Sequence, residues 1–356
     1  MKRLFFIYSI LFTSFYSIAQ NANTIIPKPA FISYPQSTDP FVLDSKQSIF
    51  YEMPYEQQAV YLQENIAKQT GILLNLKKTL NTNSLSATGI YLVSNNSLNH
   101  PAEKYELNIN KQNIQIEYHD LRGLVNGIQS LLQLMPIGQF NSIKISPVHI
   151  EDQPRFTYRG MHLDVVRHLF PVNYIKKYID YLAFHKFNTF HWHLTDDQGW
   201  RIEMEAYPKL NTIGSYRNET LIGHFKDSPA QYDGIRYGGF YTKAEIKEIV
   251  QYAAIRAITV IPEIDIPGHS RAAIAAYPEL STKPDTNWNV ATTWGMYNRQ
   301  NNVLAPKPAT FRFLEKVFDE VVALFPSPYI HVGGDECSKI WWKQDPATQA
   351  FMKEKG

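Results

Sequence analysis

Two adjacent acids, Asp335 and Glu336, stand in the segment YIHVGGDECSKIWW, where two glycines interrupt an apolar run. Neighbouring side chains on a strand point to opposite sides, so these two carboxylates have different surroundings. Two carboxyl groups in different surroundings can keep one as a protonated acid while the other stays ionised. The glycines let the backbone approach other groups closely and adopt conformations that a side chain forbids. The segment therefore predicts acid–base chemistry at the end of a strand.

Polar residues also end three other strand-like stretches. These groups are Asp164 with Arg167, Asp196 with Asp197, and Asp265 with His269. In a β/α barrel the carboxyl ends of all strands share one face, and the catalytic loops lie on that face. We therefore expect these side chains to gather with Asp335 and Glu336 in a single site.

His191 and His193 are two residues apart, so on a strand they share one face and could begin a metal site. The alternative is that both are hydrogen-bonded residues inside the sheet structure. No second cluster with clear ligand spacing accompanies them, and we expect neither a metal nor another cofactor. A metal-dependent hydrolase that uses His191, His193, Asp265 and His269 stays as a competing hypothesis, which zinc analysis with a chelator control would separate.

From Arg155 onward, strand-like and helical stretches alternate, a pattern that is typical of a parallel sheet. The predicted strands cover residues 158–166, 188–194, 258–265 and 329–334. The predicted helices cover 171–187, 242–255 and 310–325, and Thr242 with Glu245 has the spacing of a capping box. In the last helix we expect one buried stripe made of Phe311, Leu314, Phe318, Val321 and Phe325.

Residues 20–150 have a different organisation and are predicted to form a small α+β domain. Short strands are expected at 41–44, 48–51, 89–94, 105–110 and 114–119, and helices at 56–70 and 121–134. The last two strands alternate apolar and polar residues around a turn at 111–113, which predicts a hairpin with one face on a core.

Composition sets broad limits on function. The chain has 356 residues, a hydrophobic content of 44% and a formal charge of +2, so it can bury a large core but has no charge bias toward nucleic acid. We expect no nucleic-acid partner. Cys337 is the single cysteine, which excludes an intrachain disulfide and a site built on several thiolates.

Residues 1–19 have the layout of a secretory signal peptide: a basic start at Lys2 and Arg3, an apolar stretch, and small residues at Ser17 and Ala19. The alternative is a membrane anchor, but Thr13 and Ser14 weaken the apolar stretch and no cluster of stop-transfer charges follows. We therefore expect an exported protein, periplasmic or secreted, without an integral membrane anchor.

Four motifs in order, RGMHLDVVRH, FHWHLTDDQGWR, IPEIDIPGHS and HVGGDE, resemble those of the family 20 glycoside hydrolases, the β-N-acetylhexosaminidases. The segments IIPKP and 105–136 resemble the small α+β domain that precedes the catalytic barrel in that family. The resemblance implies a (β/α)8 TIM barrel and exo-acting hydrolysis of terminal β-linked GlcNAc or GalNAc from oligosaccharides or glycoconjugates. It also implies a retaining mechanism in which the 2-acetamido group of the sugar is the nucleophile.

The resemblance assigns roles to individual residues. Glu336 matches the general acid and base, and Asp335 matches the residue that orients the acetamide and stabilises the cationic intermediate. His269 and Asp196 match a supporting relay behind Glu336, and Arg167 matches a residue that binds sugar hydroxyls. Four other residues of the motifs are assigned only supporting roles: Asp164, His193, Asp197 and Asp265.

The strand count departs from the family. A closed barrel needs eight strands and about 250 residues, whereas residues 151–356 contain about four predicted strands. We therefore expect an N-terminal fragment with the first half of the barrel, inactive by itself. A sugar-binding protein without catalysis is the second competing hypothesis. The oligomeric state and the preference for GlcNAc or GalNAc stay open.

Overall fold

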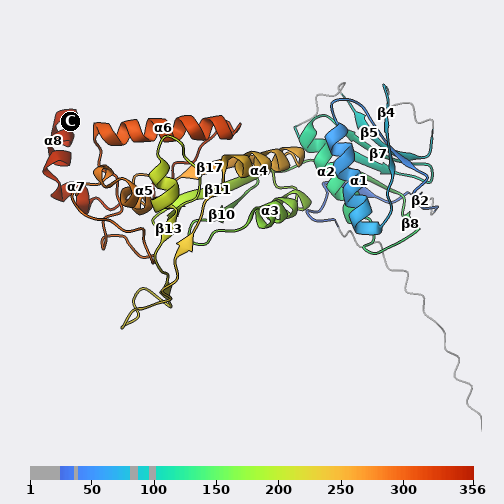
Figure 1. Ribbon diagram of the computed structural model, residues 1–356. Helices are drawn as coiled ribbons and strands as arrows, with labels where there is room; N and C mark the ends of the chain where they lie inside the picture. Colours follow the sequence, from blue (N-terminus) through green and yellow to red (C-terminus); the bar gives the residue numbers. More distant parts are fainter. Residues whose placement is uncertain (1–24, 36–38, 81–86, 96–101) are drawn as a thin grey trace, which may run out of the picture.

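The computed structural model describes residues 25–35, 39–80, 87–95 and 102–356. The predicted signal peptide lies outside these residues. The described chain forms two units, the first at the right of Figure 1 and the second at the left. In the described ranges, no helix is both long and apolar enough to span a membrane.

The first unit is built on a seven-stranded sheet with the order β1-β9-β6-β7-β5-β3-β4. The predicted hairpin is present as the antiparallel pair β6–β7, in which Leu107 faces Ile116. A separate antiparallel pair, β2–β8, completes the strands of this unit. The strands are β1 Phe31–Ser33, β2 Phe41–Asp44, β3 Ser48–Tyr51, β4 Asn75–Lys78, β5 Gly89–Ser94, β6 Tyr105–Ile109, β7 Asn113–Tyr118, β8 Ser142–Ile145 and β9 Val148–Asp152.

Two helices, α1 (Glu56–Thr70) and α2 (Leu121–Gln133), pack on this sheet (Figure 1). The side chain of Asp120 accepts a hydrogen bond from the Gly123 amide (2.7 Å) and so caps the start of α2. Strand β9 pairs with β1 as far as Glu151 and with β6 as far as Asp152, so the sheet continues two residues beyond the boundary expected at residue 150.

The second unit contains three parallel strands, β10 (Gly160–Asp164), β11 (Thr189–Asp196) and β17 (Thr259–Ile264), with β11 in the middle. Helix α3 (Val172–Phe184) follows β10, and α4 (Lys243–Ile255) precedes β17. The predicted capping box is present at the start of α4. Alternation of strands and helices therefore gives the predicted parallel sheet.

The predicted fourth strand, 329–334, is wrong in extent. It forms a single parallel bridge between His331 and Glu263, with the His331 amide donating to the Pro262 carbonyl (3.0 Å). Pro328 before it offers no amide hydrogen, and Gly333 after it turns the backbone with φ 62°. The described half-barrel therefore has three parallel strands and, in place of the predicted fourth, one parallel bridge.

The predicted stripe of α6 (Pro308–Leu324) is also partly wrong. Phe311 is 46% exposed, whereas the buried residues of the helix are Thr310, Phe313, Val317, Val321 and Leu324. Apolar residues are so frequent here that two overlapping stripes fit the helical period, and periodicity alone does not choose between them.

The remaining elements are short and connect the main ones. A long segment between β13 and β16 projects away from the second unit (Figure 1). The short connecting elements are β12 Gly199–Trp200, a π-helical turn Leu210–Gly214, β13 Tyr216–Arg217, β14 Leu221–Ile222, β15 Gln231–Tyr232, β16 Tyr237–Gly238, α5 Arg271–Ala276, a 3-10 turn Pro278–Leu280, α7 Ile340–Gln344 and α8 Pro346–Lys355.

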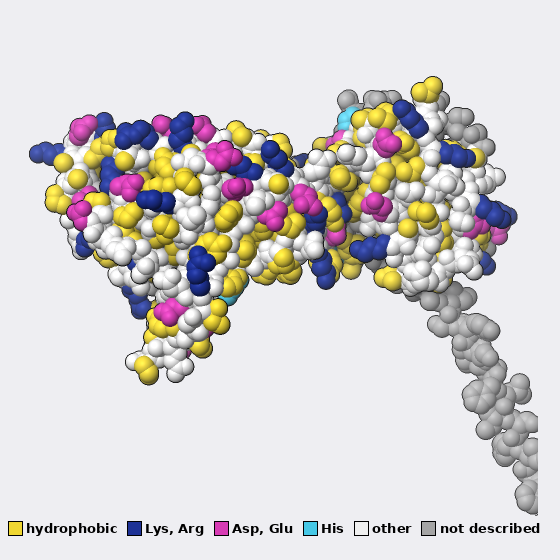
Figure 2. Space-filling model, in the orientation of Figure 1, with side chains coloured by type: hydrophobic (Ala, Val, Ile, Leu, Met, Phe, Trp, Pro, Cys, Tyr) yellow, Lys and Arg dark blue, Asp and Glu magenta, His cyan; other side chains and the backbone are white. Residues whose placement is uncertain are grey.

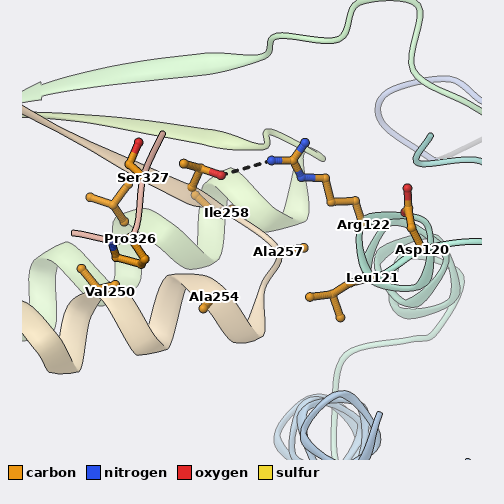
Figure 3. Close-up of a pocket in the computed structure, with 11 residues that line it drawn as sticks. Asp120, Leu121, Arg122, Val250, Ala254, Ala257, Ile258, Pro326 and Ser327 are labelled. Carbon is orange, nitrogen blue, oxygen red and sulfur yellow. Dashed lines mark hydrogen bonds between the residues drawn. The ribbon is translucent and has the colours of Figure 1, made fainter. Parts of the chain in front are cut away.

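Charged and polar contacts join the two units. Glu103, which is 4% exposed, pairs with Arg159 and accepts a hydrogen bond from Asn188 (2.9 Å). A pocket of about 450 Å³ lies beside this junction, where Arg122 of α2 reaches Thr259 of β17 (3.1 Å; Figure 3). On the face shown in Figure 2, acidic and basic side chains are mixed over both units, in line with the small net charge.

Candidate active site

The predicted polar strand ends meet at one edge of the second sheet. Parallel strands bring their carboxyl ends to the same side, and β10, β11 and β17 lie side by side in Figure 1. The chain after the His331 bridge continues along the same edge, so loops from four segments converge there. All nine predicted site residues lie at this edge: Asp164, Arg167, His193, Asp196, Asp197, Asp265, His269, Asp335 and Glu336.

Asp196 is the centre of the buried part of the site. Its side chain is 1% exposed, and its Oδ2 atom contacts the guanidinium of Arg167 (2.7 Å) and Nε2 of His193 (2.9 Å). Its Oδ1 atom contacts Nδ1 of His269 (3.0 Å). Burial by itself would raise the pKa of Asp196, but the hydrogen bonds from His193 and His269 and the charge of Arg167 hold it well below its usual range.

A bulge in β11 explains why His193 and Asp196 meet although they are three residues apart. On a regular strand such residues point to opposite faces. The register against β17 shifts between His193 and Thr195, which leaves Leu194 as an extra residue. One extra residue restores a common face for His193 and Asp196.

His269 connects Asp196 with the acid pair. Its Nδ1 atom faces Asp196 (3.0 Å) and Asp197 (3.4 Å), while its Nε2 atom lies 3.6 Å from Glu336 and 3.9 Å from Asp335. Burial alone would lower the pKa of His269, but hydrogen bonds to Asp196 and Asp197 outweigh burial and raise it to about 11. His269 thus lies between Asp196 and the acid pair, hydrogen-bonded to Asp196 and 3.6 Å from Glu336.

Asp335 and Glu336 differ from Asp196 in exposure, since their side chains are 70% and 65% exposed. The turn before them depends on glycine: a Cβ at Gly333 would stand 1.8 Å from Oδ1 of Asp265, and the next residue, Gly334, has φ 99°. The Gly334 amide donates to this Oδ1 atom of Asp265 (3.2 Å). Close backbone approach is thus the reason for glycine at position 333, as the sequence predicted.

Asp265 is buried and differs from the other acids in its proton affinity. Burial, and to a smaller degree the nearby charges of Asp196 and Asp335, raise the pKa of Asp265 to about 7, although His269 and the Gly334 amide act in the opposite direction. Two acids of the site therefore have pKa values far apart, with Asp196 low and Asp265 high.

Asp164 and Asp197 mainly organise loops. Asp164 accepts from the Val166 amide (2.8 Å) and pairs with Arg167 (2.8 Å). Asp197 accepts from the Arg271 amide (3.0 Å) and from the side chain of Asn302 (2.9 Å). Both acids thus fix the backbone from which Arg167 and His269 project.

Sequence reasoning missed Glu263 of β17. Its carboxylate contacts His191 (2.6 Å) and His193 (2.8 Å) through one oxygen and His331 (3.2 Å) through the other. Glu263 stands two residues before Asp265, on the same face of the strand. The available signal was an acid within an apolar strand, since such an acid needs buried partners.

The residues of the metal hypothesis are divided between different clusters. Among the described residues, His191 groups with Glu263 and His331, His193 and Asp265 group with Asp196, and Asp265 and His269 group with Asp335, so no one group contains all four residues. His193 directs both ring nitrogens at carboxylates, Nε2 at Asp196 and Nδ1 at Glu263, the second without hydrogen-bond geometry. The four residues His191, His193, Asp265 and His269 are therefore not arranged around one ion.

A pocket of about 610 Å³ opens beside Glu336. It is lined by Tyr297, Asn298, Glu336, Cys337, Lys339, Ile340 and Lys343. The pocket of Figure 3 lies instead between the two units and contains none of the nine predicted site residues. Of these two pockets, only the one beside Glu336 offers space for a ligand next to a predicted catalytic carboxyl.

The second unit is a parallel α/β sheet whose strand ends carry an exposed acid pair backed by histidine and a buried carboxylate, an arrangement that suits acid–base chemistry at the carboxyl ends of a β/α sheet. The comparisons with known proteins identify the family. Residues 156–356 match the model of the glycosyl hydrolase family 20 catalytic domain, and residues 22–153 match domain 2 of the same family. The chain belongs to glycosyl hydrolase family 20, as the sequence motifs predicted.

Curated relatives and solved structures agree with this assignment. A β-hexosaminidase of Porphyromonas gingivalis is 39% identical over 93% of the chain, and one of Vibrio furnissii is 45% identical over 76%. The structure of a GH20 exo-β-N-acetylglucosaminidase from Vibrio harveyi in complex with N-acetylglucosamine is 34% identical, covers 94% of the chain and has a TM-score of 0.78. These structures confirm the predicted fold class.

The chain spans about half the length of these proteins. It covers 41% of the Porphyromonas gingivalis relative, 43% of the Vibrio furnissii relative and 50% of the Vibrio harveyi structure. The activity of a whole family 20 enzyme is therefore a proposal for this sequence.

Proposed function

We propose that these residues serve an exo-acting β-N-acetylhexosaminidase, which releases terminal β-linked GlcNAc or GalNAc from oligosaccharides or glycoconjugates. The proposal applies to the longest polypeptide that is translated from the gene and contains this sequence. We call it the parent polypeptide below. One observation carries the proposal: Nε2 of the protonated His269 lies 3.6 Å from the exposed Glu336 carboxyl, and its Nδ1 atom is held by the buried Asp196.

Glu336 is proposed as the general acid and base. Its proton goes to the glycosidic oxygen as the bond to the anomeric carbon breaks, and the resulting carboxylate later takes a proton from the attacking water. The positive charge of His269 favours the carboxylate that remains after the first proton transfer. Asp196 supports this step by keeping His269 protonated and in place.

Asp335 is proposed to assist the substrate's own nucleophile. Its carboxylate accepts a hydrogen bond from the N–H of the 2-acetamido group and so orients the acetamido carbonyl oxygen toward the anomeric carbon. Attack by this oxygen and later by water retains the configuration. A fixed anion at this position also stabilises the positive charge of the cyclic intermediate. Arg167, whose side chain is 38% exposed, is proposed to bind sugar hydroxyls from the other side of the ring.

Similarity to relatives supports the substrate class. The Porphyromonas gingivalis and Vibrio furnissii relatives are named β-hexosaminidases, and the Vibrio harveyi structure is a complex with N-acetylglucosamine. We also propose export to the periplasm or the medium, from the pattern of residues 1–19.

The experiment that tests this function is release of nitrophenol from nitrophenyl N-acetyl-β-glucosaminide by the parent polypeptide, with and without EDTA. We expect turnover at the same rate in both. Loss of turnover with EDTA and its return with zinc would instead support the metal-dependent alternative.

A second proposal concerns the described chain by itself, because Asp335 and Glu336 are 70% and 65% exposed. Catalysis by groups that face open solvent is weak, since a high dielectric screens their charges. We expect the chain alone to have no measurable turnover, and binding of N-acetylglucosamine without turnover would match the sugar-binding alternative. Turnover at the parent's rate would contradict this second proposal.

A further inference from the structure

Glu263 is a buried carboxylate that does not belong to the nine predicted site residues. Its side chain is 6% exposed and lies near the carboxyl end of β17, on the strand next to that of His193. Buried carboxylates are costly unless they are paired. Four imidazoles face this one carboxylate, from β10, β11 and the segment after α6: His162, His191, His193 and His331.

Strand register brings Glu263 to His193. The two residues are direct partners in the parallel pair of β11 and β17, so their side chains leave the sheet on the same face. The Nδ1 atom of His193 then lies 2.8 Å from Glu263, while its Nε2 atom lies 2.9 Å from Asp196. With one carboxylate near each nitrogen, the His193 ring is held between two negative charges, hydrogen-bonded to Asp196 and attracted by Glu263.

Carboxylates and imidazoles thus alternate without a break from Glu263 to Glu336. The successive contacts are Glu263 to His193 at 2.8 Å, His193 to Asp196 at 2.9 Å, Asp196 to His269 at 3.0 Å, and His269 to Glu336 at 3.6 Å. The last three members are the relay already described. The first two extend it into the sheet.

On the basis of the function proposed above, we propose that Glu263 is a positioning residue of the glycosidase reaction. It orients His193 against Asp196, and His193 in turn keeps Asp196 aligned with His269 behind Glu336. Glu263 touches neither the sugar nor the reacting atoms in this scheme, so it is a residue that acts through its neighbours.

Charge balance explains why a carboxylate is required at this position. Burial alone would lower the pKa of His193, but the hydrogen bond to Asp196 and the nearby negative charges of Asp196 and Glu263 raise it to about 10, so a proton is present on each ring nitrogen at neutral pH. An amide at position 263 keeps the shape but removes one of the two anions. The charged and titratable groups around His193 are Arg167 and His162 from the β10 side, His191 and Asp196 on β11, and Glu263 and Asp265 on the β17 side.

The test compares Glu263→Gln with the unchanged parent polypeptide in pH profiles of kcat and kcat/KM. We expect kcat to fall about tenfold, a fraction of what a general acid supplies, with KM changed less than about threefold. We also expect a new ionisation between about pH 6.5 and 9 in the variant, because His193 then loses its second proton within the assayed range. Glu263→Asp, which keeps the charge, should restore the profile of the unchanged protein.

His162→Gln is the matched control, since His162 is 3.9 Å from Glu263, is half-exposed and does not belong to the alternating line. Its profile should be that of the unchanged protein. Thermal unfolding of each variant separates a loss of fold from a loss of positioning. An unchanged pH profile in folded Glu263→Gln would overturn the proposal.

A measurement without activity separates this inference from the proposed function. In protein labelled with ¹⁵N-histidine, the His193 ring, assigned by its absence in His193→Gln, should titrate more than one pH unit lower in Glu263→Gln. If the unchanged parent fails to hydrolyse the glycoside, the function proposal fails while this titration still decides the role of Glu263 toward His193. If hydrolysis is normal and neither titration nor profile moves, only the role of Glu263 is refuted.

Discussion

Asp196 and Glu336 belong to the same site but are held in opposite ways. Asp196 ends a central strand, is 1% exposed and contacts three cationic side chains. Glu336 follows a glycine turn, is 65% exposed and has its nearest cationic partner, His269, at 3.6 Å. Strand register and mutual ion pairs fix the buried line from Glu263 to His269, whereas turn geometry fixes the acid pair.

This difference separates the two kinds of loss that a substitution can cause. A buried ion that loses its partner costs stability because the partner stays behind as an unpaired charge. An exposed carboxyl contributes little to stability, so its removal should appear almost only in the rate. Each substitution below tests one side of that comparison.

The largest expected effect is that of Glu336→Gln in the parent polypeptide. We expect the rate on a disaccharide to fall by about 10³- to 10⁴-fold, because the amide cannot protonate the glycosidic oxygen. The melting temperature should stay unchanged, since the side chain is 65% exposed. Disaccharide hydrolysis at a near-normal kcat would remove Glu336 from its proposed role.

Asp335→Asn should follow, with a loss of about 10²- to 10³-fold in kcat, the size of losing a preorganised charge partner. The acetamide loses its acceptor and the cationic intermediate loses its counter-charge. Steady-state kinetics on nitrophenyl N-acetyl-β-glucosaminide give the result. A change in KM alone would mean that Asp335 binds the sugar without assisting the attack.

Asp196→Asn should lower both the rate and the stability. If only one of them falls, the comparison between Asp196 and Glu336 fails. We expect a rate loss of about 10²-fold, together with a destabilisation of about 3 kcal/mol, because three cations lose a buried anion. Denaturant unfolding checks the second part. The matched substitution at an exposed acid of the site, Glu336→Gln, should leave the unfolding midpoint in place. Equal unfolding midpoints for both variants would contradict the distinction between buried line and exposed pair.

Asp265→Asn should have the smallest effect on the rate, and its effect on stability depends on pH. The pKa of Asp265 is about 7 in the folded protein and near 3.8 in the unfolded chain, so the folded form binds the proton more tightly. Stability therefore falls as pH rises from about 4 to about 7, by at most about 1.4 kcal/mol per pH unit for this group. We expect the stability of Asp265→Asn, measured relative to the unchanged protein at the same pH, to be greater at pH 8 than at pH 4. A variant that is equally affected at both values would show that folding does not raise the pKa of Asp265.

Much of the scaffold could be predicted because local rules and tertiary structure agree there. Helix α1 begins and ends where its periodicity indicated, and the Thr242–Glu245 box starts α4. The stripe of α6 could not be predicted, since two sets of apolar residues fit one period and only the packing of the sheet selects between them.

The site was predictable as a set of residue types but not as a set of contacts. Motif order placed His269 with Asp196, and the structure brings them to 3.0 Å. The bulge at Leu194, which turns His193 toward Asp196, follows from the pairing of β11 with β17, two segments far apart in sequence. Glu263 was missed for the same reason, because its importance depends on histidines from other segments.

Dependence on the 2-acetamido group of the substrate tests the central proposal most directly. The measurement compares kcat/KM of the parent polypeptide on nitrophenyl N-acetyl-β-glucosaminide and on nitrophenyl β-glucoside, which carries a hydroxyl at position 2. If the substrate supplies the nucleophile and Asp335 orients it, the first substrate should react more than about 10³-fold faster, since an oriented internal nucleophile is lost in the second. Rates within about tenfold of each other would mean that the protein supplies its own nucleophile and would contradict the roles given to Asp335 and Glu336.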